Sequence, residues 1–240
     1  MNNSFIQGVV VGVVIVGLLG GVYMLGARNG GGLSLGSGNT VTTPTPTAPT
    51  GDPNQPTLGA VKAISKDDHI VGKSNAKIVL LEYSDLECPY CKTFHATMQQ
   101  VVDAYGDKVA WVYRHFPLSF HANAQKEAEA SECVASLGGN DKFWKFVNAI
   151  YERTTANGTG FALDKLAPLA KEVGVDEAKF TDCLNSGKFA DKVKTDLDEG
   201  QTAGVTGTPG TIIMVDGKAQ SIIPGALPFA SIKATIDGLL

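Results

Sequence analysis

At 240 residues, the chain is long enough for one or two domains. Its composition, with 43% hydrophobic residues, is ordinary for a globular protein. The net charge of −4 provides no basic patch, so the sequence argues against a nucleic-acid-binding protein. Four cysteines allow three different pairings, and their meaning depends on the cellular compartment.

Residues 1–28 are predicted to form a transmembrane anchor. Phe5–Ala27 contains no charged residue, and as a helix its 23 residues would span about 34 Å, enough to cross a membrane. A cleaved signal peptide is the alternative, but the basic N-terminal region is missing and Leu25-Gly26-Ala27 is a poor cleavage site. Arg28 argues weakly against placing the following residues outside the cell. We infer their extracytoplasmic location from their chemistry instead.

Residues 29–63 are predicted to be a disordered linker in two parts. Gly30–Gly38 is rich in Gly and Ser and is flexible by composition. Thr40–Thr57 holds five prolines and seven threonines in 18 residues, which favours extended polyproline conformations. This composition cannot form a core, so the segment is interpreted as a tether between a membrane and a soluble domain. A Pro-rich interaction tail is the alternative.

A globular domain is predicted for residues 64–240, and it begins with a strand–helix–strand unit. Asp68–Gly72 could form a short edge strand, and Lys77–Tyr83 contains four consecutive aliphatic residues, typical of a strand buried on both faces. Pro89–Tyr105 has an apolar stripe at helical spacing, and Lys108–His115 alternates like a strand. This order predicts a right-handed parallel unit.

Cys88-Pro89-Tyr90-Cys91 opens the predicted helix. Pro89 suits the first turn, because its missing N–H would have no intrahelical partner there. Cys88 then lies at or next to the N-cap, where free backbone N–H groups and the helix dipole favour a thiolate. Cys91 lies one turn further along, within reach of a disulfide. The sequence therefore predicts a redox pair with Cys88 as nucleophile and Cys91 as resolving thiol.

A zinc site is the alternative interpretation of this motif. Structural zinc normally needs a second Cys-x-x-Cys pair or a spaced pair of histidines. Cys133 and Cys183 stand alone, 50 residues apart, and the spacing of His115 and His121 fits no common zinc pattern. We therefore expect no metal and no other cofactor, and we expect His115 to be structural and His121 to start a helix.

The remaining chain divides into a helical block, at about residues 121–203, and a closing β-β-α segment. The expected helices of the block are Ala122–Leu137, one capped by Asp141, Leu163–Val173, Asp176–Leu184 capped by Asp176, and Lys188–Gly204. A loop is expected at Thr154–Gly160. The closing segment contains strands at Thr211–Val215 and Ala219–Ile223, an Asp216-Gly217 turn and a helix at Pro228–Leu239.

These features resemble the thioredoxin fold, and more closely the DsbA family of disulfide oxidoreductases in its membrane-tethered branch. The resemblance extends from about residue 66 to the C-terminus. It is carried by Glu82-Tyr83-Ser84-Asp85-Leu86-Glu87-Cys88-Pro89-Tyr90-Cys91, Tyr113-Arg114-His115-Phe116-Pro117-Leu118, Phe143-Trp144 and Gly204-Val205-Thr206-Gly207-Thr208-Pro209. Cys-Pro-Tyr-Cys alone would also suit a glutaredoxin. The 121 positions between Cys88 and Pro209, however, accommodate a helical insertion like that of DsbA.

The resemblance assigns further residues to the site. It implies that Pro209 is a cis proline opposite the dithiol and that Thr208 presents backbone groups to a bound peptide, in the manner of an added strand. Tyr90 would tune the thiolate and contact partners. Gly210-Thr211 departs from the family, which often has a bulkier residue after the proline.

Glu82 precedes Cys88 by six residues, where thioredoxin-like proteins often carry a buried acid. Because an unpaired buried carboxylate is costly, we expect a raised pKa and a role in moving protons to and from Cys91. Pairing with a lysine on a sheet edge is the alternative. Glu87 is expected to be solvated and to oppose the Cys88 thiolate slightly.

Cys133 and Cys183 fall on two helices of the predicted insertion. Outside the cytoplasm a structural disulfide between them is favoured, and related proteins with cysteines in these places suggest the same. Two buried free thiols, packing as small hydrophobic groups, are the alternative.

The sequence thus predicts an α/β thioredoxin-like domain with a helical insertion, behind a transmembrane helix and a Gly/Thr/Pro-rich linker. The resemblance implies a monomeric thiol–disulfide oxidoreductase, in the periplasm or on the outer face of the cell membrane. It would introduce disulfides into reduced or unfolded exported proteins, and a membrane redox partner would reoxidise it. A reductase or isomerase of the same fold, or a membrane-tethered chaperone or peptide-binding module with incidental thiols, is the alternative.

Overall fold

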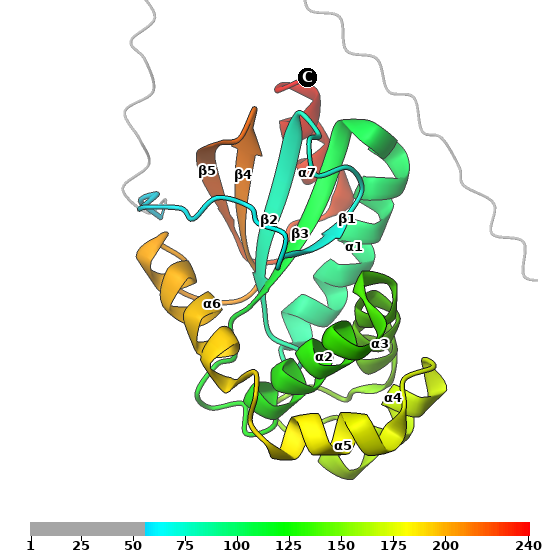
Figure 1. Ribbon diagram of the computed structural model, residues 1–240. Coiled ribbons are helices and arrows are strands. Elements are labelled where there is room, and N and C mark those ends of the chain that lie inside the picture. The colour runs from blue at the N-terminus through cyan, green and yellow to red at the C-terminus, as the bar shows by residue number, and fades with distance from the viewer. Residues whose placement is uncertain (1–55) are drawn as a thin grey trace, which may run out of the picture. The chain divides into compact units, whose positions relative to one another are not determined.

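The computed structural model describes residues 56–240 (Figure 1). The predicted membrane anchor and the predicted linker up to residue 55 lie outside the described residues. Within the described part, no helix is long and apolar enough to cross a membrane. The chain from residue 56 onward forms a mixed sheet with helices on both faces, and most of the helices follow β3 in the sequence.

The sheet has five strands in the order β1-β3-β2-β4-β5. They are β1 (His69–Val71), β2 (Ile78–Ser84), β3 (Val109–His115), β4 (Gly210–Val215) and β5 (Lys218–Pro224). β2 and β3 run parallel, and the other neighbouring pairs are antiparallel. The predicted parallel unit is therefore confirmed. So is the hairpin turn, where Asp216 and Gly217 both adopt positive φ, as a two-residue hairpin turn requires.

Two apolar layers cover the sheet, and alternate residues of β2 face each of them. Ile78 and Leu80 belong to the layer that contains α1 (Pro89–Tyr105) and α7 (Phe229–Asp237). Val79 and Leu81 face the other layer, which includes residues of α6 (Ala190–Thr202). Burial on both faces explains the continuous aliphatic run. By the same alternation, the next even residue, Glu82, faces the α1 side.

The helical block lies between β3 and β4, as predicted. Its helices are α2 (Ala124–Gly138), α3 (Asn140–Arg153), α4 (Leu166–Glu172), α5 (Glu177–Asn185) and α6 (Ala190–Thr202), with a 3₁₀ turn at Leu163–Lys165 before α4. Another 3₁₀ turn, Gly106–Lys108, lies outside the block, between α1 and β3. Asp176 caps α5 by accepting a hydrogen bond from the Lys179 N–H, which confirms the predicted cap. Cys133 of α2 and Cys183 of α5 form a disulfide.

The predicted cap at Asp141 is wrong. Helix α3 begins two residues earlier than that cap implies, directly after Gly139, whose φ of 80° lets the chain turn from α2 into α3. Asp141 therefore lies within the first turn. The preceding Asn140 is not a cap either, because its side chain accepts from the Ile70 N–H at 3.2 Å and donates to the Ile70 carbonyl at 2.9 Å.

Residues 56–63, placed in the linker by composition, pack against the domain. The Gly59 N–H donates to the Ala203 carbonyl at 2.9 Å, and Leu58 and Val61 contact the apolar layer beside α6. The Arg114 guanidinium donates to the backbone carbonyls of residues 62 and 63 and forms a buried ion pair with Asp68. The domain thus includes a short N-terminal segment with little secondary structure of its own.

Candidate active site

Cys88 occupies the N-cap of α1, in extended conformation, with Pro89 at the first helical position. Its Sγ lies 3.4 Å from the Thr208 carbonyl oxygen. The neighbouring Cys91 thiol lowers the pKa of Cys88 most strongly, and Thr208 and the backbone N–H groups of Cys91 and Tyr90 add to this effect against the opposing effect of burial. The pKa of Cys88 falls to about 6, so the thiolate predominates at neutral pH.

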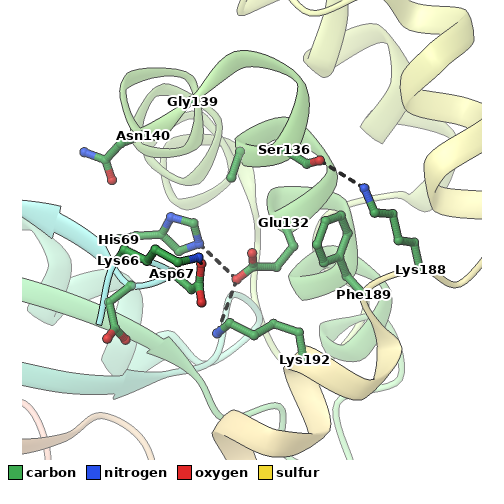
Figure 2. Close-up of a pocket in the computed structure, with 12 residues that line it drawn as sticks. Lys66, Asp67, His69, Glu132, Ser136, Gly139, Asn140, Lys188, Phe189 and Lys192 are labelled. Atoms are coloured by element: carbon green, nitrogen blue, oxygen red, sulfur yellow. Dashed lines mark hydrogen bonds and ion pairs between the residues drawn. The ribbon is translucent and has the colours of Figure 1, made fainter. Parts of the chain in front are cut away.

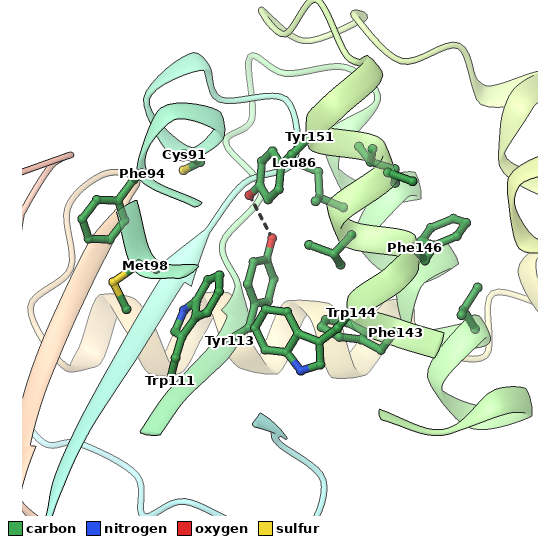
Figure 3. Packing of buried hydrophobic residues seen from close by; sticks show 14 of the residues in the cluster. Leu86, Cys91, Phe94, Met98, Trp111, Tyr113, Phe143, Trp144, Phe146 and Tyr151 are labelled. Atoms are coloured by element: carbon green, nitrogen blue, oxygen red, sulfur yellow. Dashed lines mark hydrogen bonds between the residues drawn. The ribbon is translucent and has the colours of Figure 1, made fainter. Parts of the chain in front are cut away.

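Cys91 lies one turn further into α1, fully buried among apolar and aromatic side chains (Figure 3). Burial, followed by the proximity of Cys88, raises the pKa of the Cys91 thiol well above its ordinary value. Both cysteines are free thiols in this structure. The dithiol is therefore asymmetric, because the outer sulfur ionises while the inner sulfur keeps its proton.

Glu82 is fully buried on β2, an interior strand, beneath this dithiol. The Ser84 hydroxyl donates to its Oε1 at 2.7 Å, and the Trp111 indole N–H donates to its Oε2 at 2.8 Å. Burial raises the pKa of Glu82 to about 7, and these two hydrogen bonds offset part of the rise. Within residues 56–240 no lysine pairs with Glu82, and β2 is an interior strand, so the alternative of an ion pair on a sheet edge is wrong.

A chain of hydroxyl groups continues from Glu82 through the interior. Ser84 lies beside Cys91, and its hydroxyl is 3.0 Å from the Tyr151 hydroxyl. Tyr151 in turn lies 3.2 Å from the Tyr113 hydroxyl, a contact visible in Figure 3. Sequence reasoning missed these three residues. Ser84 could have been found, since it follows Glu82 on the same strand face, whereas nothing in the sequence marks Tyr151 on the distant α3.

The loop before β4 closes the other side of the dithiol. The Thr208–Pro209 peptide bond is cis, and Thr208 is the residue that contacts Cys88. A shallow cavity of about 210 Å³ is lined by this loop, by Ile222 and by Pro56 of the N-terminal segment. An added Cβ at Gly210 would lie 2.6 Å from a Val205 methyl group, so a larger residue here would force Val205 to shift.

Two exposed aromatic side chains belong to the surroundings of the motif, one within the motif itself and one linked to it through a hydrogen bond. Tyr90, inside the motif, is 67% exposed. Phe120 is 75% exposed and precedes His121, whose Nδ1 lies 2.8 Å from an Asp85 carboxylate oxygen. The Asp85 contact therefore fixes the Phe120 loop to the turn that leads into the motif. His121 lies three residues before α2 rather than starting it.

The expectation that Glu87 is solvated is wrong. Its side chain is fully buried, and it accepts hydrogen bonds from the Gly160 N–H at 2.6 Å, the Phe161 N–H at 2.8 Å and the Thr154 hydroxyl at 3.0 Å. The Asn157 N–H also donates to the Glu87 carbonyl. The loop after α3 thus folds over the residue next to the nucleophile.

One group of possible metal ligands occurs among the described residues, formed by His115, Glu132 and Asp196. The Lys192 ammonium lies among them, 2.6 Å from Asp196 and 3.8 Å from Glu132. His69 lies 2.9 Å from Glu132, and Figure 2 shows the Glu132 contacts with His69 and Lys192. Because a side-chain cation already neutralises the carboxylates, we interpret the cluster as an ion-pair network joining β1, β3, α2 and α6. His115 is one of its satisfied structural members.

Comparisons with known proteins point to one family. A family model described as Thioredoxin matches residues 64–237. The fold resembles DsbA2 of Pseudomonas aeruginosa, with 28% identity and a TM-score of 0.62 over 75% of this chain and 97% of that chain. BdbD of Bacillus subtilis, in its oxidised form, matches with 25% identity and a TM-score of 0.64 over 77% and 98% of the two chains. Wolbachia pipientis alpha-DsbA1, at 24% identity and a TM-score of 0.62, supports the fold alone.

Curated relatives match over a shorter stretch. The Na⁺/H⁺ antiporter NhaA of Herminiimonas arsenicoxydans is 31% identical over 142 residues, 59% of this chain and 21% of that protein. NhaA 1 of Mycolicibacterium vanbaalenii is 30% identical over 145 residues, 59% of this chain and 22% of that protein. The chain spans about a fifth of the length of these relatives, so no transport activity is inferred from them.

Proposed function

This chain belongs to the thioredoxin family, and from that premise we propose that it is a protein thiol–disulfide oxidoreductase that introduces disulfides into exported proteins. The observation that carries the proposal is the asymmetric dithiol at the start of α1, with a low pKa on Cys88 and a high pKa on Cys91. The similarity of the chain to DsbA2 of Pseudomonas aeruginosa and BdbD of Bacillus subtilis, at 28% and 25% identity, supports the same function.

Oxidation of a substrate begins with the Cys88–Cys91 disulfide. A substrate thiolate attacks Cys88 Sγ, the enzyme's S–S bond breaks, and its electron pair leaves on Cys91. The Cys91 thiolate is costly in its buried site and takes a proton, for which Glu82 is the nearby acid with Ser84 between them. Glu82 shifts between acid and carboxylate near neutral pH, as its pKa of about 7 allows.

The second step releases the product. Another substrate thiolate attacks the substrate sulfur of the mixed disulfide, and the new substrate disulfide forms as Cys88 leaves as a thiolate. A pKa of about 6 makes Cys88 a good leaving group. The substrate has lost two electrons and two protons, and the enzyme dithiol has gained two electrons. A membrane redox partner then accepts these electrons and restores the enzyme disulfide.

The low pKa of Cys88 also favours oxidation of the substrate over its reduction. A depressed pKa stabilises the reduced form above that pKa, and the stabilisation is lost as the pH falls through about 6. At pH 7 the difference from an ordinary thiol biases the equilibrium about tenfold toward the reduced form, or about 30 mV for two electrons. A reductase or isomerase would use the same residues without this bias.

The location is part of the same proposal. Residues 1–28 anchor the chain in the membrane, residues 29–55 tether it, and the monomeric domain faces the periplasm or the outer side of the cell membrane. The uncharged stretch Phe5–Ala27 supports the anchor. The disulfide between Cys133 and Cys183 supports an oxidising compartment, because such bonds rarely persist in the cytosol.

A direct test supplies the oxidised full chain to a reduced, unfolded protein that carries two cysteines in its native disulfide. We expect stoichiometric formation of the substrate disulfide and loss of two free thiols, with catalytic turnover when a chemical oxidant is added. Cys88→Ser should abolish both while the protein keeps its circular dichroism spectrum. A wild-type chain that binds the unfolded substrate but removes none of its thiols would instead favour a peptide-binding module with incidental thiols.

A further inference from the structure

Glu127, on α2, is a fully buried carboxyl group that the mechanism does not use. Among the buried carboxyl groups of the described residues, it is the one with no hydrogen-bond donor on either oxygen. A buried carboxylate without donors is costly, so this side chain is expected to be neutral. Its role depends on what faces it.

Two other acids face Glu127 from the turn before Cys88. Glu87 and Asp85 both raise the pKa of Glu127, in addition to the larger effect of burial, and the result is about 10. No basic side chain contributes to this shift, and two basic side chains of the surrounding turn and loop have other partners. The Lys92 ammonium donates to the Thr154 carbonyl, and His121 bonds to Asp85.

The hydrogen bonds show which acid of the group holds the proton. Glu87 accepts on both oxygens, from two backbone N–H groups and the Thr154 hydroxyl. Asp85 also accepts on both oxygens, from the N–H groups of Glu87 and Leu118 and from His121. These donors stabilise negative charge on Glu87 and Asp85, whereas Glu127 has no donor that would stabilise a charge. The proton therefore belongs on Glu127.

We propose that Glu127 is a neutral carboxylic acid at physiological pH and donates a hydrogen bond to the Glu87 carboxylate. This acid pair joins α2 to the turn that carries Cys88, and through Glu87 to the loop at residues 154–161. It also disperses the negative charge that lies next to the nucleophile. Glu127 thereby acts as a positioning residue for the Cys88 thiolate.

This role rests on the proposed function only in that Cys88 is the nucleophile. Protonation of Glu127 is measurable without any activity. Removing the donor with Glu127→Ala leaves the Glu87 charge less dispersed, which disfavours the adjacent thiolate. Glu127→Gln keeps a neutral donor of the same shape. The alanine variant should therefore raise the pKa of Cys88, and the glutamine variant should keep the wild-type pKa.

Infrared spectroscopy of the reduced full chain in detergent tests the proton directly. At about pH 8.5, Glu82 with its pKa of about 7 is ionised and Glu127 with its pKa of about 10 is not. We expect the carbonyl stretch of a protonated carboxylic acid at this pH, and we expect its loss in Glu127→Gln. Glu129→Gln is the matched control on the same helix, since Glu129 is paired with Lys126. A wild-type spectrum without a band that depends on Glu127 would overturn the proposal.

The thiolate absorbance of Cys88, followed against pH, tests the positioning role. Glu127→Ala should raise the pKa of Cys88 by about one unit, and Glu127→Gln should return it to the wild-type value. An unchanged pKa in a folded Glu127→Ala variant would contradict this role. If Glu127→Ala does not fold, the infrared comparison with Glu127→Gln still shows whether Glu127 is protonated. A chain that shows the band but oxidises no substrate would refute the proposed function and leave this proton assignment standing.

Discussion

The two cysteine pairs of this chain differ in chemical state. One is a disulfide between two helices, and the other is a pair of free thiols whose pKa values are shifted in opposite directions. Cys133 and Cys183 lie on helices α2 and α5 and are joined. Cys88 lies at a helix N-terminus against the loop of Pro209, and Cys91 lies behind it above Glu82. Burial alone therefore does not decide what a cysteine does. Helix termini, backbone donors and a neighbouring acid decide which sulfur carries charge.

The largest expected effect separates the two sulfurs of the reactive pair. Cys91→Ala leaves Cys88 able to attack a substrate disulfide but removes the thiol that would release the adduct. We expect no multiple-turnover oxidation and an accumulation of covalent adducts, visible on non-reducing gels. Cys88→Ala is the matched control and should form none. Adducts formed through Cys91 in that control would reverse the assignment of roles.

Glu82→Gln is expected to give the next largest effect on activity. Loss of the proton donor to Cys91 should slow the oxidation step on the order of 100-fold and flatten its pH dependence near pH 7. The wild-type pKa of about 7 should appear in the rate profile. A variant that keeps the wild-type pH profile would show that Glu82 does not move this proton.

The same variant has an opposite effect on stability. An acid with a raised pKa holds an extra proton in the folded state. The folded protein therefore loses stability as the pH rises from the pKa of Glu82 in the unfolded chain through its folded pKa of about 7. Above pH 7, Glu82→Gln should therefore be more stable than the wild type by up to about 3 kcal/mol. Chemical denaturation at two pH values measures this, and a less stable variant at alkaline pH would contradict it.

The local elements around the site could be predicted from the sequence. The alternation in β3, the aliphatic run of β2 and the Pro89 start of α1 are local signals, and each element lies where they indicate. The raised pKa of Glu82 also followed from a charged residue within that run.

Long-range contacts could not be predicted in this way. Glu87 follows a turn and is predicted to be solvated, but a loop 73 residues further along the chain covers it. Glu127 lies in a helix rich in Ala and Glu, and the sequence does not show which of these glutamates is buried without a hydrogen-bond donor. Residues 56–63 have the composition of a linker, and only their contacts with Ala203 and Arg114 show that they belong to the domain.

The structural pair is expected to affect stability rather than chemistry. Replacing Cys133 and Cys183 by Ala removes a disulfide with a sequence separation of 50 residues. The free energy of unfolding should fall by about 2–4 kcal/mol, while the reduction potential of the other pair stays unchanged. Denaturant titration and redox equilibration measure the two quantities separately. A changed potential would mean that the two pairs are coupled.

The smallest expected effect concerns the N-terminal segment. An added Cβ at Gly59 would lie 2.1 Å from the Thr202 carbonyl oxygen, so Gly59→Ala must displace the segment. We expect a loss of about 1–2 kcal/mol in the free energy of unfolding. Gly238→Ala is the control, because its Cβ meets neighbours only at 3.6 Å. Equal stability of the two variants would show that residues 56–63 contribute little to the domain.

The reduction potential of the Cys88–Cys91 pair, measured by equilibrating the full chain with glutathione buffers at pH 7, tests the central claim most directly. The proposed oxidase role predicts a value near about −120 mV, to which the low pKa of Cys88 contributes about 30 mV. A value near roughly −270 mV would identify a reductase and contradict the proposed direction.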